Sequence, residues 1–136
     1  MNSLVAIAIA SLVAAPAFAE GDAAKGEKTF NKCKACHMFA ADAGTVIFKG
    51  GKTGPNLYGI AGRTAGSADF RYGNDLVAAG EKGLVWDLDN FTAFVADSRG
   101  FLSDYLGSSA KSKMSFRLKS ADDAADICAY IESVSN

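Results

Sequence analysis

Two cysteines and a histidine stand close together early in the chain. Cys33 and Cys36 are separated by two residues, and His37 follows at once. This spacing is typical of c-type haem attachment. Each thiol can add to a vinyl group of a porphyrin, and the histidine can then ligate the iron from below. The segment predicts one covalently bound haem c; the alternative is a chance cluster of two cysteines and a surface histidine.

The opposite side of the iron needs a second protein ligand or stays open. His37 is the only histidine, so a second histidine of this chain is excluded. Met1 lies in an expected leader, and Met38 adjoins His37, which ties it to the same face. Met114 is the remaining methionine, and a thioether favours reduced iron and raises its potential. Lys113 is the alternative ligand, although its amine must first lose a proton.

Two protein ligands would leave the iron no position for a substrate, which favours electron transfer over catalysis. A Ser-His-Asp hydrolase is excluded because the one histidine is committed to haem. Two other classes stay open. They are a peroxidase-type haem enzyme with a displaceable distal ligand, and a gas-binding haem protein.

The first 19 residues have the pattern of an export signal. An apolar run over residues 4–15 is interrupted only by Ser11 and is too short to span a bilayer. Residues 17–19, Ala-Phe-Ala, match a small-x-small cleavage site. We expect cleavage after Ala19 and a single periplasmic domain over residues 20–136. No Lys or Arg precedes the apolar run, and a retained membrane anchor is the alternative.

The charges nearly cancel but are unevenly distributed. The net charge of −1 argues against generic nucleic-acid binding. Residues 107–120 are basic without an acid, whereas residues 81–104 are mostly acidic. A basic rim around an exposed haem edge would orient an acidic partner during encounter. The lysines expected to form it, unless they are ordinary solvated side chains, are Lys32, Lys34, Lys52, Lys111 and Lys113.

Hydrophobic periodicity and capping residues predict about five helices. Asp22, Asp87 and Ser98 are suitable N-caps, and Ser120 with Asp123 resembles a capping box. Gly26 inside the first helix suggests close approach by another backbone. The helices are expected at residues 22–31, 74–80, 88–96, 98–106 and 120–134.

Loops are expected over residues 40–66, which hold seven of the glycines and Pro55, the only proline after Ala19. The run at 45–48 is short and bounded by glycine, so no strand is expected. The residue order of a phosphate-binding P-loop is absent. The fold class is therefore all-α, with about five helices and long loops wrapped around one covalently bound haem.

These motifs resemble class I cytochrome c, most closely the bacterial periplasmic cytochrome c₂ branch, also called the c-550 type. The likeness covers nearly the whole chain after Ala19. It is carried by residues 21–30, by residues 52–57, by the loop around Met114 and by the final helix at 126–130. The resemblance implies a soluble one-haem electron carrier of the periplasm.

The resemblance also implies roles for single residues. The Pro55 carbonyl would accept a hydrogen bond from His37. Arg63, Tyr72 and Trp86 would hold the haem propionates, with core packing as the alternative for Trp86. Two phenylalanines would line the haem pocket, and the first and last helices would cross with two residues of each in contact. The two phenylalanines are Phe94 and Phe116. At the crossing, Gly26 and Phe30 of the first helix would pack against Ile127 and Tyr130 of the last helix.

Partners follow from the same resemblance. The electron donor would be a quinol-oxidising cytochrome complex of the bc type, and the acceptor a photosynthetic reaction centre or a terminal oxidase. A monomer is expected. Cys128 is expected to be a small buried apolar residue, with an intermolecular disulfide as the alternative.

The chain departs from the family pattern in the region before Met114. Phe94 stands where many members have a tyrosine whose hydroxyl reaches the methionine sulfur. Ser98 stands where proline is common, and residues 99–112 are longer than in the short mitochondrial form. Loss of the tyrosine hydroxyl is expected to alter both the haem potential and the strength of the iron–Met114 bond.

Overall fold

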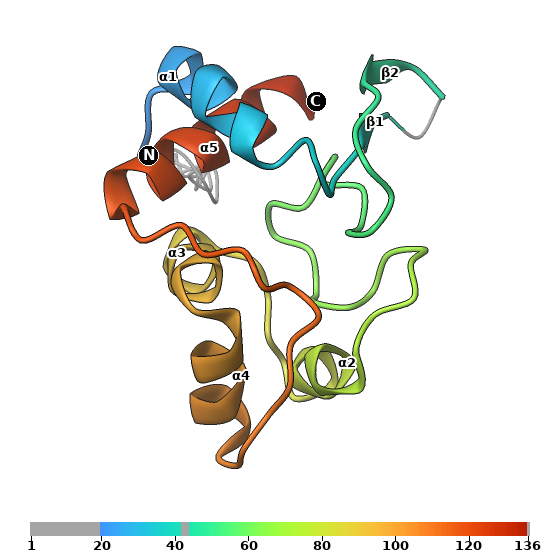
Figure 1. Cartoon of the computed structure of the whole chain (residues 1–136), viewed down its shortest axis with the longest axis vertical. Helices are drawn as coiled ribbons and strands as arrows, with labels where there is room; N and C mark the ends of the chain where they lie inside the picture. Colours follow the sequence, from blue (N-terminus) through green and yellow to red (C-terminus); the bar gives the residue numbers. More distant parts are fainter. Residues whose placement is uncertain (1–19, 42–43, 136) are drawn as a thin grey trace, which may run out of the picture.

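The computed structural model describes residues 20–41 and 44–135 (Figure 1). The predicted leader, residues 1–19, lies outside the described residues. Five α-helices form in this part of the chain, as predicted, together with one 3₁₀ helix and two short strands. In chain order they are α1 (Ala23–Thr29), η1 (Phe30–Lys32), β1 (Phe39–Ala40), β2 (Val46–Phe48), α2 (Asn74–Glu81), α3 (Leu88–Ala96), α4 (Ser98–Leu106) and α5 (Ala121–Val134).

Side-chain caps begin four of these helices. The carboxylate of Asp22 accepts from the Lys25 N–H at the start of α1. Asp87 caps α3 and Ser120 caps α5 in the same way, as predicted. The predicted cap of α4 is wrong. Asp97 accepts from the Gly100 N–H, and Ser98 is the first residue of the helix.

The expectation of no strand is also wrong. β1 and β2 pair antiparallel, with Phe39 opposite Phe48 and a bulge before the pairing of Ala40 with Val46. The two rings stack with their centroids 5.7 Å apart, and the Phe30 ring meets both edge-on. Aromatic packing stabilises this pair, which is too short to carry a recognisable alternating pattern.

The first and last helices cross at one end of the molecule (Figure 1). A Cβ on Gly26 would overlap the backbone carbonyl of Asp126, so glycine is required for this approach. The Phe30 and Tyr130 rings lie 5.4 Å apart beside the crossing. The close helix contact predicted from Gly26 is therefore present.

Cys128 lies on α5 within the hydrophobic core and is 0% exposed. The alternative of a surface thiol that forms an intermolecular disulfide is therefore wrong. Burial and the nearby Glu132 carboxylate raise the pKa of the Cys128 thiol. The side chain acts as a small apolar core residue.

The remaining helices form the other end of the molecule. α3 packs against α5 and α4, and α4 also contacts α2 (Figure 1). Residues 107–120 run from the end of α4 back to α5. Over residues 20–41 and 44–135, no helix has both the length and the apolar character needed to cross a membrane.

Candidate haem-binding site

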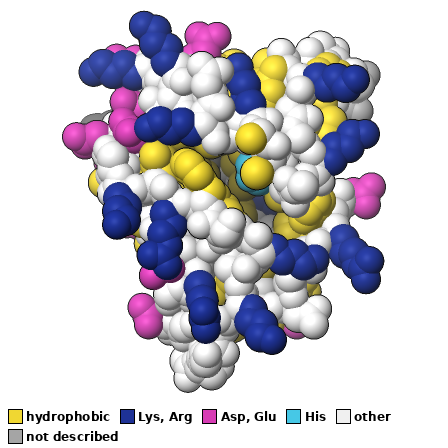
Figure 2. Space-filling view, viewed as in Figure 1, with side chains coloured by type: hydrophobic (Ala, Val, Ile, Leu, Met, Phe, Trp, Pro, Cys, Tyr) yellow, Lys and Arg dark blue, Asp and Glu magenta, His cyan; other side chains and the backbone are white. Residues whose placement is uncertain are grey.

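A cavity of about 420 Å³ lies between the two ends of the molecule. Figure 2 shows a hollow with hydrophobic side chains and the histidine ring in it, and with Lys and Arg side chains around it. Its walls come from the segment after η1, the glycine-rich loops, α3 and the segment before α5. This volume lies within the range of small-molecule and cofactor sites.

Cys33, Cys36 and His37 form one wall of the cavity. They follow η1 directly in a tight turn, in which the His37 N–H donates to the Cys33 carbonyl at 3.0 Å. All three cysteines of the chain lie in the described ranges and are free thiols. Burial raises the pKa of Cys33 to about 11, with a smaller contribution from Cys36, and Lys32 opposes the shift.

The His37 ring has a defined tautomer. Its Nδ1–H donates to the Pro55 carbonyl at 2.7 Å, which leaves the lone pair on Nε2 available to a metal. Burial lowers the pKa of His37 and thus favours the neutral imidazole that a metal needs; the bond to Pro55 opposes this shift. Gly54 lies against the ring, where a Cβ would overlap the imidazole.

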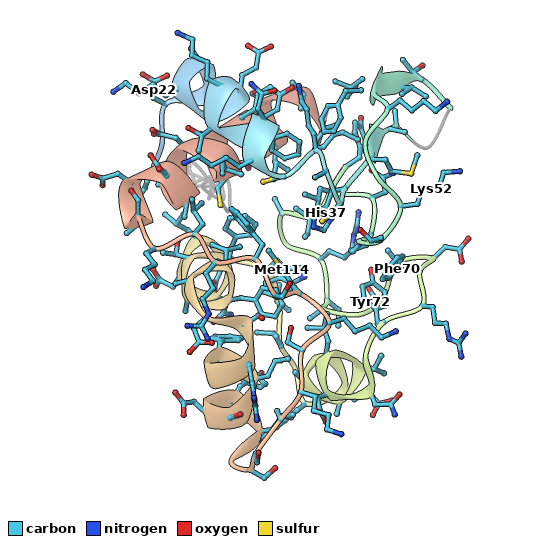
Figure 3. The ribbon with its side chains drawn as sticks, in the orientation of Figure 1. Asp22, His37, Lys52, Phe70, Tyr72 and Met114 are labelled. Carbon is cyan, nitrogen blue, oxygen red and sulfur yellow. The ribbon has the colours of Figure 1, made fainter. Side chains whose placement is uncertain are left out.

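Met114 borders the same cavity from the segment that precedes α5. Figure 3 shows His37 and Met114 on two separate segments, and the two residues are 77 positions apart in the chain. Two thiols and one imidazole around a mostly apolar cavity are the groups that attach and ligate a covalently bound haem, and a thioether is one of the second ligands that such a haem can take. The site therefore fits the cofactor predicted from the sequence.

The three residues expected at the haem propionates all border the cavity. The Arg63 guanidinium donates to the Tyr58 carbonyl. The Tyr72 ring meets Phe70 edge-on, with their centroids 5.1 Å apart. Trp86 is buried and packs edge-on against Phe94 at 4.9 Å, so it belongs both to the cavity wall and to the core.

Phe94 and Phe116 also border the cavity, but in different surroundings. Phe94 is buried on α3. Phe116 is 39% exposed and lies two residues after Met114. Phe116 is therefore accessible at the surface, whereas Phe94 contributes to the interior wall.

The five lysines expected to surround the site occupy different positions. Lys32, Lys111 and Lys113 border the cavity, whereas Lys34 and Lys52 are not among its lining residues. Lys32 forms an exposed ion pair with Asp123 at 3.8 Å, and the Lys113 ammonium donates to the Arg71 carbonyl at 3.0 Å.

The two lysines that do not line the cavity are Lys34, inside the haem motif, and Lys52, on the loop that contacts this motif. Lys34 lies over the Phe48 ring, with its Nζ 4.9 Å from the centroid. Lys52 is exposed on the loop before Pro55, and its side chain points outward in Figure 3. Three of the five predicted docking lysines are therefore at the mouth of the site.

Sequence reasoning missed two features of the site. The sequence predicts Gly54 in a loop with no specific contact, and it predicts Ser98 as a helix cap. In the structure, Gly54 touches His37, and the Ser98 hydroxyl donates to the Met114 carbonyl at 2.8 Å. A tertiary contact of a glycine or a serine has no local signature, although the departure at Ser98 from the family pattern marked the position as unusual.

The chain is similar to known proteins over almost its whole length. Residues 23–135 match the family "Cytochrome c". Cytochrome c-551 of Roseobacter denitrificans is 60% identical over 99% of this chain and 97% of its own length. Cytochrome c2 of Rhodobacter capsulatus is 51% identical over 97% of this chain and 96% of its own length. The crystal structure of cytochrome c2 from Rhodobacter sphaeroides is 49% identical with a TM-score of 0.82, and covers 85% of this chain and 98% of that one.

Proposed function

This chain belongs to the cytochrome c family, and from that premise we propose that His37 and Met114 are the two axial ligands of its haem iron. Membership in the family means that the chain carries a covalently attached haem c and transfers electrons rather than catalysing a reaction. When bound, the haem supplies the iron that gains or loses one electron. Cys33 and Cys36 would hold it through two thioethers.

One observation carries the ligand proposal: His37 and Met114, far apart in the chain, border one cavity. The Nδ1–H of His37 is held by Pro55, which directs Nε2 as the ligating atom. Met114 offers a neutral sulfur that stabilises reduced iron. Two protein ligands would leave no open position for oxygen or peroxide, as an electron carrier requires.

The absorption spectrum of the oxidised, haem-loaded protein tests this proposal. Sulfur ligation to ferric haem gives a weak band at the edge of the near infrared, and we expect it in the parent. Met114→Ala should lose the band and should bind carbon monoxide when reduced. Lys113→Ala is the matched control and should keep the band. A band that survives in Met114→Ala would show that another residue is the ligand.

The finer parts of the function are proposals as well. We propose export to the periplasm after cleavage behind Ala19, which N-terminal sequencing of the secreted form tests by finding Glu20 first. The proposed electron donor is a quinol-oxidising cytochrome complex of the bc type. The proposed acceptor is a photosynthetic reaction centre or a terminal oxidase.

Charge at the cavity mouth supports a docking role for the lysines that border it. Lys111 and Lys113 are exposed beside the exposed ring of Phe116. With a purified bc-type complex, the association rate should fall roughly tenfold between low and physiological ionic strength. Lys111→Ala should weaken this dependence, whereas Lys25→Ala on α1 should not. A rate independent of salt would contradict electrostatic steering.

A further inference from the structure

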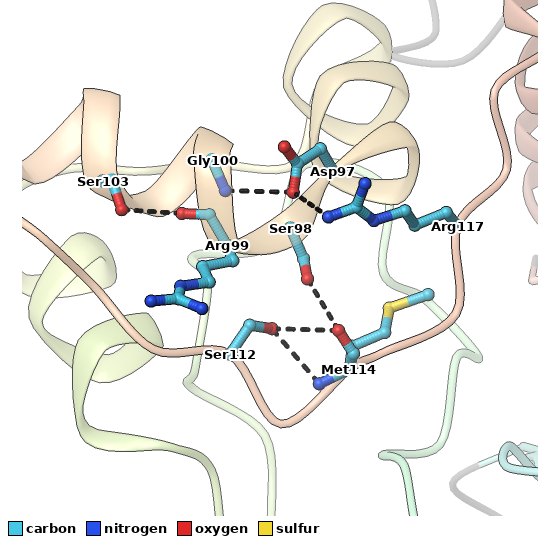
Figure 4. A network of polar contacts seen from close by, with 8 residues as sticks. All are labelled: Asp97, Ser98, Arg99, Gly100, Ser103, Ser112, Met114 and Arg117. Atoms are coloured by element: carbon cyan, nitrogen blue, oxygen red, sulfur yellow. Dashed lines mark hydrogen bonds and ion pairs between the residues drawn. The ribbon is translucent and has the colours of Figure 1, made fainter.

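Two serine hydroxyls bind the backbone of Met114 (Figure 4). Ser98 Oγ donates to the Met114 carbonyl at 2.8 Å. Ser112 Oγ accepts from the Met114 N–H at 3.2 Å and makes a longer contact with the carbonyl at 3.4 Å. Side chains therefore hold both polar backbone groups of the proposed iron ligand.

Ser98 differs from Ser112 in its burial. It is 3% exposed and is the only buried polar residue within the described ranges. A hydroxyl taken out of water without a partner is costly, and the Met114 carbonyl is the acceptor that offsets this cost. Water cannot readily compete for the bond, so it constrains Met114 more strongly than an exposed bond would.

α4 and its N-cap residue hold the Met114 segment on both sides. After Met114, the Arg117 guanidinium contacts the Asp97 carboxylate at 3.3 Å, and Asp97 also caps the helix (Figure 4). Before Met114, the Ala110 N–H donates to Ser103 Oγ at 3.0 Å. α4 and its N-cap residue thus contact residues 110–117 at three points, and the contact of Ser98 with Met114 is the middle one along this segment.

We propose that Ser98 is a positioning residue for iron ligation: its hydroxyl holds the Met114 backbone so that the thioether stays directed at the iron. This inference rests on the proposed ligation by Met114. Phe94, which borders the same cavity, has no hydroxyl to offer the sulfur. The hydrogen bonds from the two serines therefore restrain the backbone of Met114 and do not involve its sulfur atom.

Displacement of the methionine by imidazole measures this constraint directly. The oxidised, haem-loaded protein is titrated with imidazole, and loss of the sulfur band reports displacement. Ser98→Ala should bind imidazole roughly fivefold more tightly, since it loses about one net hydrogen bond. Ser98→Thr keeps the hydroxyl and should restore the parent affinity. Ser133→Ala removes a hydroxyl that donates to the Tyr130 carbonyl on α5, and it should bind imidazole as the parent does.

A second hydroxyl-free variant separates ligand positioning from helix stability. Ser98 is the first residue of α4, a position that proline suits, so Ser98→Pro removes the hydroxyl without removing the helix start. It should bind imidazole more tightly, as Ser98→Ala does. Thermal unfolding measured alongside shows whether general destabilisation could account for the change.

The outcomes distinguish this inference from the ligand proposal. If Ser98→Ala and Ser98→Pro bind imidazole with the parent's affinity, Ser98 has no positioning role, even where the unfolding temperature falls. If Met114→Ala keeps the sulfur band, the ligand assignment fails and this inference fails with it. If Met114→Ala loses the band while the Ser98 variants remain unchanged, only this inference is overturned.

Discussion

His37 donates its Nδ1–H to the Pro55 carbonyl at 2.7 Å, across 18 positions of the chain. The bond orients the ring and selects the tautomer in which Nε2 can ligate a metal. It also depends on the loop between the two residues, because Gly54 lies directly against the imidazole. Two features therefore orient the His37 ring: the hydrogen bond to the Pro55 carbonyl, and the space that Gly54 leaves because it has no side chain.

Gly54→Ala should disturb this arrangement. A Cβ at this position would overlap the His37 ring, and overpacking of this kind costs about 1–3 kcal/mol. Guanidinium unfolding of the haem-loaded protein, followed by haem absorbance, should show that loss. Lys52→Ala, an exposed change on the same loop, should leave the midpoint unchanged. Equal midpoints for the two variants would mean that the ring moves aside without cost.

Gly26→Ala should destabilise the protein although alanine is the better helix former. Its Cβ would overlap the Asp126 carbonyl and force α1 away from α5, so the free energy of unfolding should fall by about 1–3 kcal/mol. Lys25→Ala, an exposed neighbour on α1, is the control. Both values come from denaturant unfolding of the haem-loaded protein. A stabilised Gly26→Ala variant would be evidence that the helices can separate freely.

The helices were predictable because their signals are local. α3 and α4 begin and end at the residues expected from apolar periodicity. The predicted cap of α4 lies one residue too late, because Asp97 and Ser98 are both suitable caps. The carboxylate of Asp97 takes that role, and the hydroxyl of Ser98 is used in a tertiary contact instead.

The strand pair and the finer contacts of the site could not be predicted in this way. β1 has two residues, too few for an alternating pattern, and it is stabilised by rings from distant positions. The contact of Ser98 with Met114 likewise depends on packing between segments 16 residues apart. The haem motif could be recognised from the sequence because two thioether bonds and one histidine ligand require a fixed local spacing of Cys33, Cys36 and His37.

Cys128 should be unreactive in the native, haem-loaded protein. With Cys33 and Cys36 in thioethers, it is the only free thiol, and it is fully buried with a raised pKa. A thiol reagent should therefore label no cysteine of the native protein, even at mildly alkaline pH. After unfolding it should label one cysteine per chain. Reaction of the native protein at neutral pH would place the thiol at the surface.

Substitutions at Cys128 extend this prediction to stability. Cys128→Ser should lower the free energy of unfolding by about 1–3 kcal/mol, since it brings a hydroxyl into the core. Cys128→Ala, which leaves only a small gap, should cost less. Denaturant unfolding checks the order of the two variants, and the reverse order would contradict an apolar environment.

Phe94→Tyr tests the departure from the family pattern on α3. Phe94 is buried against Trp86 and borders the cavity shared with Met114, so the variant adds a hydroxyl to the cavity wall. An O–H directed at the methionine sulfur would draw electron density from it and disfavour ferric iron. We expect the midpoint potential to rise by about 20–60 mV, the equivalent of roughly one hydrogen bond.

Redox titration measures the potential, and imidazole titration of the oxidised form measures the iron–Met114 bond. Phe101→Tyr is the matched control, since Phe101 packs edge-on against Phe94 but is not among the lining residues of the cavity. It should leave the potential unchanged. If Phe94→Tyr changes neither the potential nor imidazole binding, the residue at this position tunes neither the iron nor the iron–Met114 bond.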